Sequence, residues 1–317
     1  MRTAVTLAVN GRSQLVEPTV PVRQLTVRPP GTAAPLDALV ATPDNATGVL
    51  VYFPGFNTPL GPWEAAKSQL IAQVSGMNVV VTEIPGMSRF GDPIPKAIRR
   101  DMLHERADSW AELTLHYVVG ALGTAGVDAP SHLRVLGYST GCSLAVAALP
   151  MLKEWAQIAG LSLVEPVAIT RRNLVTLHVD NMADLGRQPA SYATNRPHDW
   201  VMTARRRQVR EPSVHYGPVD LVAIATILAA PGLMQSLSEP GLSRCELVRG
   251  ANSSLCKRRD FERLHSLLEA QGVPGPTFTV TGLGHPVWHS FPAIVPLIEA
   301  MLSEALPGTE GALARIE

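Results

Sequence analysis

Continuous apolar runs alternate along the chain with stretches of helical period. The segments GVLVYFPGF (48–56) and MNVVVTEIPG (77–86) are apolar runs that end at a Pro-Gly pair. Between them, GPWEAAKSQLIAQVSG (61–76) has helical period and closes with glycine. Fully buried strands read as continuous apolar runs, whereas surface helices repeat their apolar residues every three to four positions. The alternation predicts an α/β fold with a mostly parallel central sheet and helices on both faces.

The same pattern continues on either side of these segments. The helical stretch 99–126 contains a second start signal near Asp108-Ser109. Further strands are predicted at 24–31, 36–44, 133–136, 160–169, 245–250 and 277–282, and further helices at 143–149, 257–272 and 292–306.

One long segment interrupts the alternation. Residues 170–243 contain arginine pairs and a triplet, scattered aromatic residues and prolines, and no clear strand. We interpret this segment as a helical cap, or lid, inserted into the core. The prediction is a first core part at 1–169, the cap at 170–243, a second core part at 244–306 and a C-terminal tail at 307–317.

A very tight turn joins a predicted strand to a predicted helix in LRVLGYSTGCSLAVAAL (133–149). Its apex is Ser139, flanked two positions away by Gly137 and Gly141. A serine hydroxyl is a nucleophile only when it is presented clear of the backbone and a base takes its proton. Glycine on both sides removes side chains that would collide with the neighbouring strand and helix. The pattern therefore predicts an exposed, reactive Ser139.

Gly-x-Ser-x-Gly in this context resembles the nucleophile elbow of the α/β-hydrolase superfamily. The resemblance extends from about Gln24 to Leu302 and implies an α/β-hydrolase fold with a helical cap. It also implies a serine hydrolase of the esterase, lipase or thioesterase kind, which forms an acyl-enzyme on Ser139. The backbone N–H groups of Phe56 and Thr140 are the implied oxyanion hole.

The family's general base is a histidine in the loop after the last strand. TVTGLGHPVWHS (279–290) offers His285 directly after Gly-Leu-Gly, and His289 four residues later. We assign the base to His285 and expect His289 on the first turn of the final helix.

The family's catalytic triad also contains an acid that hydrogen-bonds to the base, and several residues of this sequence are candidates for it. The family's usual aspartate position falls on Asn252 or Ser253, which carry no charge. Asp260 lies further along, on the predicted next helix. The other location is the end of the strand after the elbow helix, where Glu165 precedes a proline. We predict Glu165, with Asp260 and a neutral Asn252 or Ser253 as the alternatives.

Composition narrows the choice of partners. The 317 residues have a formal net charge of +0, which gives no electrostatic reason to expect nucleic acid or an anionic membrane. No apolar run reaches the roughly 18 residues of a membrane span. Three sparse cysteines without metal-like spacing favour a reducing, cytoplasmic setting and no metal site. We therefore expect a small-molecule acyl substrate, no cofactor and no membrane span.

Rival interpretations remain for the whole chain and for single segments. An acyltransferase would use the same residues, and a non-catalytic or weakly active binding protein on this scaffold would explain the missing aspartate. The arginine triplet 205–207 fits either an anionic substrate group or a solvated helix face. Tyr192, Trp200 and Tyr216 fit either an acyl pocket or the packing of the cap. Cys142 fits a small buried helix residue.

Overall fold

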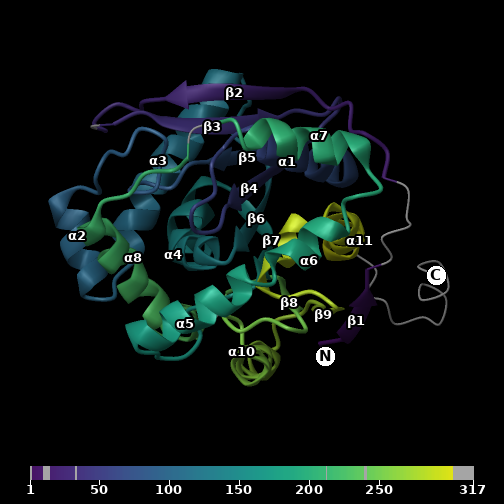
Figure 1. Ribbon diagram of the computed structural model, residues 1–317. Coiled ribbons are helices and arrows are strands. Elements are labelled where there is room, and N and C mark those ends of the chain that lie inside the picture. Colours follow the sequence, from purple (N-terminus) through teal and green to yellow (C-terminus); the bar gives the residue numbers. More distant parts are fainter. Residues whose placement is uncertain (1, 10–14, 33, 212, 239–240, 303–317) are drawn as a thin grey trace.

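The computed structural model describes residues 2–9, 15–32, 34–211, 213–238 and 241–302 (Figure 1). The predicted tail at 307–317 lies outside these residues. The strands are β1 (Ala4–Ala8), β2 (Val22–Val27), β3 (Leu36–Ala41), β4 (Val49–Phe53), β5 (Asn78–Thr82), β6 (His132–Tyr138), β7 (Gln157–Val164), β8 (Cys245–Gly250) and β9 (Thr277–Thr281). The helices are α1 (Pro62–Ser75), α2 (Lys96–Leu103), α3 (Asp108–Ala125), α4 (Thr140–Trp155), α5 (Leu174–Leu185), α6 (Gln188–Ala193), α7 (Asp199–Gln208), α8 (Pro218–Ala229), α9 (Gly232–Ser236), α10 (Arg258–Ala270) and α11 (Phe291–Leu302), with a 3₁₀ turn η1 (His285–His289).

The strands form a nine-stranded sheet in the order β1-β9-β8-β7-β6-β4-β5-β3-β2. Neighbouring strands are parallel except at β3, which runs antiparallel to both β5 and β2. The predicted mostly parallel sheet is therefore confirmed. Parallel strands bring their carboxyl ends to one edge of a sheet, and ligand sites of α/β folds lie outside that edge.

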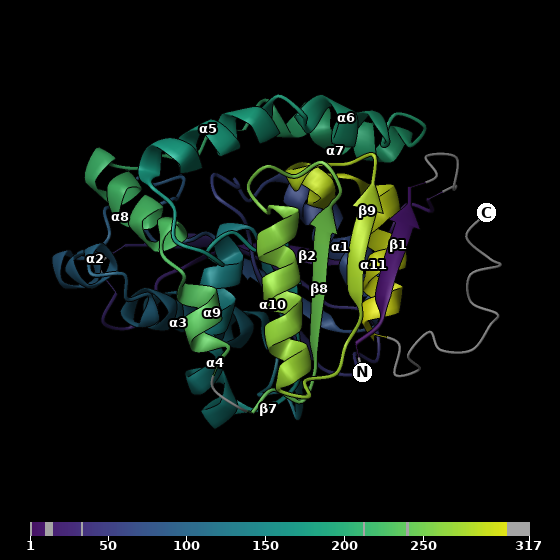
Figure 2. The same cartoon turned by 90° about the horizontal axis from the view of Figure 1, so that it is seen from below.

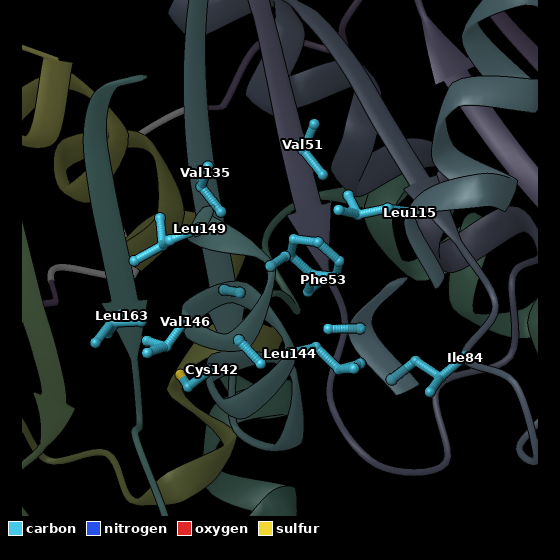
Figure 3. Close-up of a cluster of buried hydrophobic side chains, with 14 of the residues drawn as sticks. Val51, Phe53, Ile84, Leu115, Val135, Cys142, Leu144, Val146, Leu149 and Leu163 are labelled. Carbon is cyan, nitrogen blue, oxygen red and sulfur yellow. The ribbon is translucent and has the colours of Figure 1, made fainter. Parts of the chain in front are cut away.

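Two apolar cores lie on the two faces of the sheet. In β4 the side chains of Val49, Val51 and Phe53 join one core, while Leu50 and Tyr52 join the other, because successive strand residues point to opposite faces. Helices α1 and α11 cover the second core, and α3, α4 and α10 cover the first. Figure 3 shows α4 residues packed onto β4, β6 and β7 in the first core.

Between β7 and β8 the described residues form the helices α5 to α9 and contribute no strand to the sheet. Helices α5 and α6 run across the carboxyl ends of β8 and β9, which Figure 2 shows from below. Helix α7 packs against α1, and α8 packs against α2. The segment after α7 is joined to the core at a bridge where the His215 N–H donates to the Ser88 carbonyl at 2.9 Å.

The structure departs from the sequence prediction at three elements. Strand β1 was not predicted; it pairs in parallel with β9 at one edge of the sheet. Strand β7 ends at Val164 and not at 169, because the backbone turns at Glu165 into the left-handed region, with φ 56°. His289 ends the η1 turn and does not lie on the final helix, which begins at Phe291.

None of the helices in the described part of the chain combines the length and apolar character needed to cross a membrane.

Candidate active site

Ser139 occupies the tight turn between β6 and α4. Its backbone has φ 54° and ψ −116°, a strained conformation for a residue with a side chain. A Cβ on Gly141 would overlap the carbonyl oxygen of Phe53, and one on Gly137 would lie 2.7 Å from the Cα of Cys142. The two glycines therefore let the elbow helix and β4 approach closely enough to hold this turn.

His285 follows β9 and begins the η1 turn. Its Nε2 lies 2.7 Å from the Oγ of Ser139. The ring stacks on Tyr138, with centroids 5.7 Å apart, and the Tyr138 hydroxyl donates to the His285 carbonyl at 3.2 Å. Tyr138 thus packs on one face of the His285 ring and also hydrogen-bonds to the His285 backbone.

Glu165 follows β7 and is fully buried. Its Oε2 lies 2.9 Å from His285 Nδ1, and the hydroxyl of Ser253 donates to the same oxygen at 2.6 Å. The backbone N–H of Gly250 donates to the other oxygen, Oε1. Both carboxylate oxygens are therefore hydrogen-bonded, as burial of a charged group requires.

The other candidates for the third triad member lie elsewhere. Asp260 is on α10, where Arg172 donates to its carboxylate at 3.0 Å. The backbone N–H of Asn252 donates to the Leu283 carbonyl at 2.9 Å. Ser253 hydrogen-bonds to Glu165 itself. The structure brings Ser139, His285 and Glu165 together and separates Asp260 from them.

The two residues whose backbone N–H groups are expected to form an oxyanion hole line the same cavity. Among the described residues, no oxygen accepts a hydrogen bond from the N–H of Phe56 or of Thr140. Thr140 is the first residue of α4, where backbone N–H groups lack helical partners. Phe56, Ser139 and Thr140 all line a cavity of about 220 Å³.

A second cavity, of about 560 Å³, also reaches Ser139. Its wall includes His285 and two of the three aromatic residues that the sequence singled out, Tyr192 and Tyr216. The third, Trp200, packs on Phe291 instead, with ring centroids 5.5 Å apart. Ser139 therefore lies where two cavities meet.

A buried ion pair near this second cavity was not anticipated from the sequence. Lys67 Nζ lies 2.5 Å from Glu64 Oε1, and both side chains are almost completely buried. Burial lowers the pKa of Lys67, and the neighbouring carboxylate opposes that shift. Burial, and then the positive charge of Lys67, lower the pKa of His289 well below its usual value. In the sequence the pair has only the (i, i+3) spacing common on exposed helix faces, so no signal marked it.

The cysteines and other metal-binding residue types form no metal site in the described part of the chain. Cys142, Cys245 and Cys256 are buried free thiols. Burial raises the pKa of the Cys142 thiol well above its usual value, which keeps it protonated and unreactive beside the elbow. The described residues contain no group of three His, Cys, Asp or Glu side chains arranged to hold a metal ion.

Solved esterases share the architecture. A thermostable esterase from Pseudomonas putida is similar with a TM-score of 0.52 and 20% identity, over 92% of this chain and 84% of its own. A hyperthermophilic esterase from the archaeon Pyrobaculum calidifontis gives a TM-score of 0.51 at 19% identity, over 90% of this chain and 86% of its own. No protein-family profile and no curated protein sequence matches the chain. The chain has the α/β-hydrolase fold.

Proposed function

We propose that this protein is a serine hydrolase that cleaves an ester, thioester or related acyl bond. The observation that carries the proposal is the hydrogen-bonded chain from Glu165 through His285 to Ser139, with donor–acceptor distances of 2.9 and 2.7 Å. The esterase neighbours support it through the fold alone. A complete acid–base–nucleophile chain also argues against a non-catalytic binding protein, because binding alone would not require it.

Each residue has a defined part in the proposed reaction. Ser139 Oγ attacks the acyl carbon while His285 Nε2 takes its proton. The carboxylate of Glu165 fixes the imidazole tautomer by accepting the Nδ1–H, and it stabilises the imidazolium that forms. His285 then protonates the departing group, and a water molecule activated by the same imidazole hydrolyses the acyl-enzyme.

The tetrahedral intermediate carries a negative oxygen that needs hydrogen-bond donors. We assign these to the backbone N–H groups of Phe56 and Thr140. They have no acceptor among the described residues and border the cavity beside Ser139. Fixed donors of this kind stabilise developing charge without reorganisation during the reaction.

The segment 170–243 is the proposed cap. Its helices line both cavities: Leu177 lines the smaller cavity, and Tyr192 and Arg205 line the larger one. A small-molecule acyl substrate would bind between cap and sheet. Reduced, buried cysteines agree with a cytoplasmic setting, which remains part of the proposal.

Covalent labelling tests the proposal directly. A small neutral fluorophosphonate should label the wild-type protein on Ser139, as peptide mapping would show, and should not label Ser139→Ala. Wild type should also hydrolyse 4-nitrophenyl butyrate, and His285→Ala should reduce turnover on the order of a thousandfold. His289→Ala should have a much smaller effect. A folded protein that is neither labelled nor active on this ester would favour the binding-protein alternative.

A further inference from the structure

The two cavities that meet at Ser139 differ in chemical character. Outside the elbow, the smaller one is walled mainly by aliphatic side chains such as Val167, Leu177, Ile224 and Leu228. The larger one combines aromatic side chains such as Trp63 and Tyr192 with the charged side chains of Glu64, Asp184 and Arg205. The larger cavity can therefore accept a polar or charged part of a substrate, whereas the smaller one suits an apolar part.

The position of His285 decides which part leaves. The imidazole must reach the departing oxygen to protonate it, so the leaving alcohol has to lie on the side of His285. His285 lines the larger cavity and does not line the smaller one. Of the two proposed donors to the acyl oxygen, Thr140 lines only the smaller cavity and Phe56 lines both. This arrangement favours the acyl chain in the smaller, apolar cavity and the alcohol in the larger one.

Among the charged side chains that line the larger cavity, Glu64 and Asp184 each have an ion-pair partner in the described part of the chain, and Arg205 does not. Lys67 pairs with Glu64 at 2.5 Å, and Arg187 pairs with Asp184 at 2.9 Å. Two backbone N–H groups also donate to Asp184. No carboxylate of the described residues forms an ion pair with Arg205. The guanidinium of Arg205 thus lines the cavity without taking part in an ion pair of the described residues.

The guanidinium of Arg205 packs on an aromatic ring. It lies 3.8 Å from the centroid of the Tyr192 ring, a cation–π contact that favours this position beside the cavity. One turn further along α7, Gln208 lines the same cavity, and its Oε1 accepts from the backbone N–H of Trp63 at 3.1 Å. The other two arginines of the triplet, Arg206 and Arg207, do not line this cavity.

We propose that the ester cleaved by this protein has an apolar acyl chain and an alcohol that carries an anionic oxygen group, a carboxylate or a phosphate, bound by Arg205. This inference rests on the proposed serine hydrolase function. Arginine suits such groups because its planar fork donates two parallel hydrogen bonds to them.

The test compares butyrate esters that differ only in the leaving group. The neutral ester is phenyl butyrate, the anionic esters carry a 4-carboxylate or a 4-phosphate on the ring, and the cationic ester carries a 4-trimethylammonium group. Wild type should prefer the anionic esters by kcat/KM. Arg205→Gln should lower the ratio of anionic to neutral kcat/KM by about tenfold or more, because it removes hydrogen bonds to a charged group. Arg205→Lys should restore part of that ratio.

Arg206→Gln is the matched control, because it removes one positive charge from the same helix outside the cavity. It should leave the ratio at the wild-type value. Circular dichroism and fluorophosphonate labelling of each variant would show that the fold and Ser139 are intact.

Three results would overturn the inference while leaving the hydrolase proposal standing. They are an unchanged ratio in Arg205→Gln, a preference for the trimethylammonium ester, and an Arg205 dependence seen instead with an anionic acyl group, as in 4-nitrophenyl hemisuccinate. The last result would mean that the substrate binds in the reverse orientation. A wild-type protein that neither hydrolyses phenyl butyrate nor reacts with the fluorophosphonate would overturn both proposals.

Discussion

Ser139 has a backbone conformation that costs on the order of 1–3 kcal/mol for a residue with a side chain. Two backbone hydrogen bonds hold it there: its N–H donates to the Val164 carbonyl at 2.9 Å, and its carbonyl accepts from the Cys142 N–H at 3.0 Å. Hydrogen bonds to β7 and within α4 therefore stabilise the strained backbone conformation of Ser139. A change that separates β7 from α4 should allow Ser139 to relax to an unstrained conformation.

A substitution at Gly141 tests whether close packing of α4 stabilises this conformation of Ser139. Gly141→Ala would place a methyl group against the Phe53 carbonyl, so α4 or β4 must move. We expect a loss of about 1–3 kcal/mol in the free energy of unfolding, as in overpacked cores, together with loss of fluorophosphonate labelling. Gly123→Ala on α3 is the control, because nothing lies within 4 Å of its added Cβ. This control should gain about 0.5–1 kcal/mol in urea unfolding. Equal behaviour of the two variants would contradict the close-approach argument.

The third triad member is tested by a pair of isosteric changes. Glu165→Gln replaces the acceptor for His285 Nδ1–H with a group that destabilises the required tautomer. We expect ester turnover to fall by about 10³–10⁴-fold, as for the matching change in serine proteases. Asp260→Asn should alter turnover by less than about threefold, because its carboxylate contacts Arg172 and not the imidazole. Full activity in Glu165→Gln would exclude Glu165 as the partner of the base.

The residue patterns pointed to Ser139 and His285, because a strand–turn–helix with glycine on both sides and a Gly-x-Gly-His after the last strand are local signals. Glu165 was preferred to Asp260 because it stands at a strand end, whereas Asp260 lies on the predicted next helix. Its contact with His285 could not be derived from the sequence, because β8 lies between β7 and β9 and the contact depends on how the loops after these strands pack. The buried pair of Glu64 and Lys67 was missed because spacing along a helix does not show which face is buried.

At the scale of elements, the junction between β3 and β5 contains a carboxylic acid in an unusual state. Glu83 follows β5, is 1% exposed, and accepts hydrogen bonds from the backbone N–H groups of Asp37 at 3.0 Å and Arg89 at 2.7 Å. Burial raises the pKa of Glu83 to about 7, although these two hydrogen bonds oppose the shift. The folded protein therefore retains a proton there at a pH at which the unfolded chain has released it.

This raised pKa predicts the sign of a pH effect on stability. Between about pH 4.5 and 7 the folded state binds more protons at Glu83 than the unfolded state does, so this contribution to stability falls as pH rises. Relative to Glu83→Gln, the free energy of unfolding of wild type should decrease by about 3 kcal/mol from pH 4.5 to pH 8. Urea unfolding at several pH values measures it. In Glu262→Gln, which changes an exposed carboxylate on α10, the free energy of unfolding should depend on pH as it does in wild type. The same pH dependence in Glu83→Gln and wild type would refute the shifted pKa of Glu83.

Strand β1 shows where element prediction from sequence stops. Its five residues alternate between exposed and half-buried positions, and no turn signal marks its start. An edge strand of this kind gains most of its stability from pairing with β9, at the other end of the chain. Buried strands such as β4 and β5 were predicted because both of their faces are apolar.

At the scale of the whole molecule, Arg172 links the proposed cap to the core. Its side chain is 5% exposed and reaches Asp260 on α10 at 3.0 Å and Asp180 on α5 at 3.6 Å. Its backbone N–H donates to the Ala229 carbonyl at the end of α8 at 2.9 Å. One residue thus contacts two cap helices and one core helix.

Removing this link should loosen the cap without unfolding the sheet. Arg172→Met removes an ion-pair partner from the buried Asp260 and from the half-buried Asp180, and the loss of one partner of a buried pair typically costs about 3–5 kcal/mol. We expect faster amide hydrogen exchange in α5 and little change in β4 to β6, measured by mass spectrometry. Arg171→Met removes a solvent-exposed pair with Glu105 and should leave exchange in α5 near the wild-type rate. Indistinguishable exchange in the two variants would show that Arg172 does not anchor the cap.

The change from alternating strands and helices to a segment without a clear strand predicted that residues 170–243 are mostly helical. The lining of the cavities could not be predicted in the same way. Which of the three arginines at 205–207 faces the cavity depends on how α7 packs against α1, and the triplet alone does not contain that information. The meeting of two cavities at Ser139 likewise depends on tertiary packing between helices distant in sequence.

The pairing of β1 with β9 also has a consequence for synthesis on the ribosome. Arg2 donates to the Val273 carbonyl, a contact that spans 271 residues. At the usual elongation rate of roughly 5–20 residues per second, β1 waits on the order of 15–50 s before its partner strand is made. Throughout that interval the sheet can form only from β2 onward, and the nascent chain exposes an unpaired segment that chaperones can bind. The addition of β1 at the edge of the sheet is therefore a late step in folding.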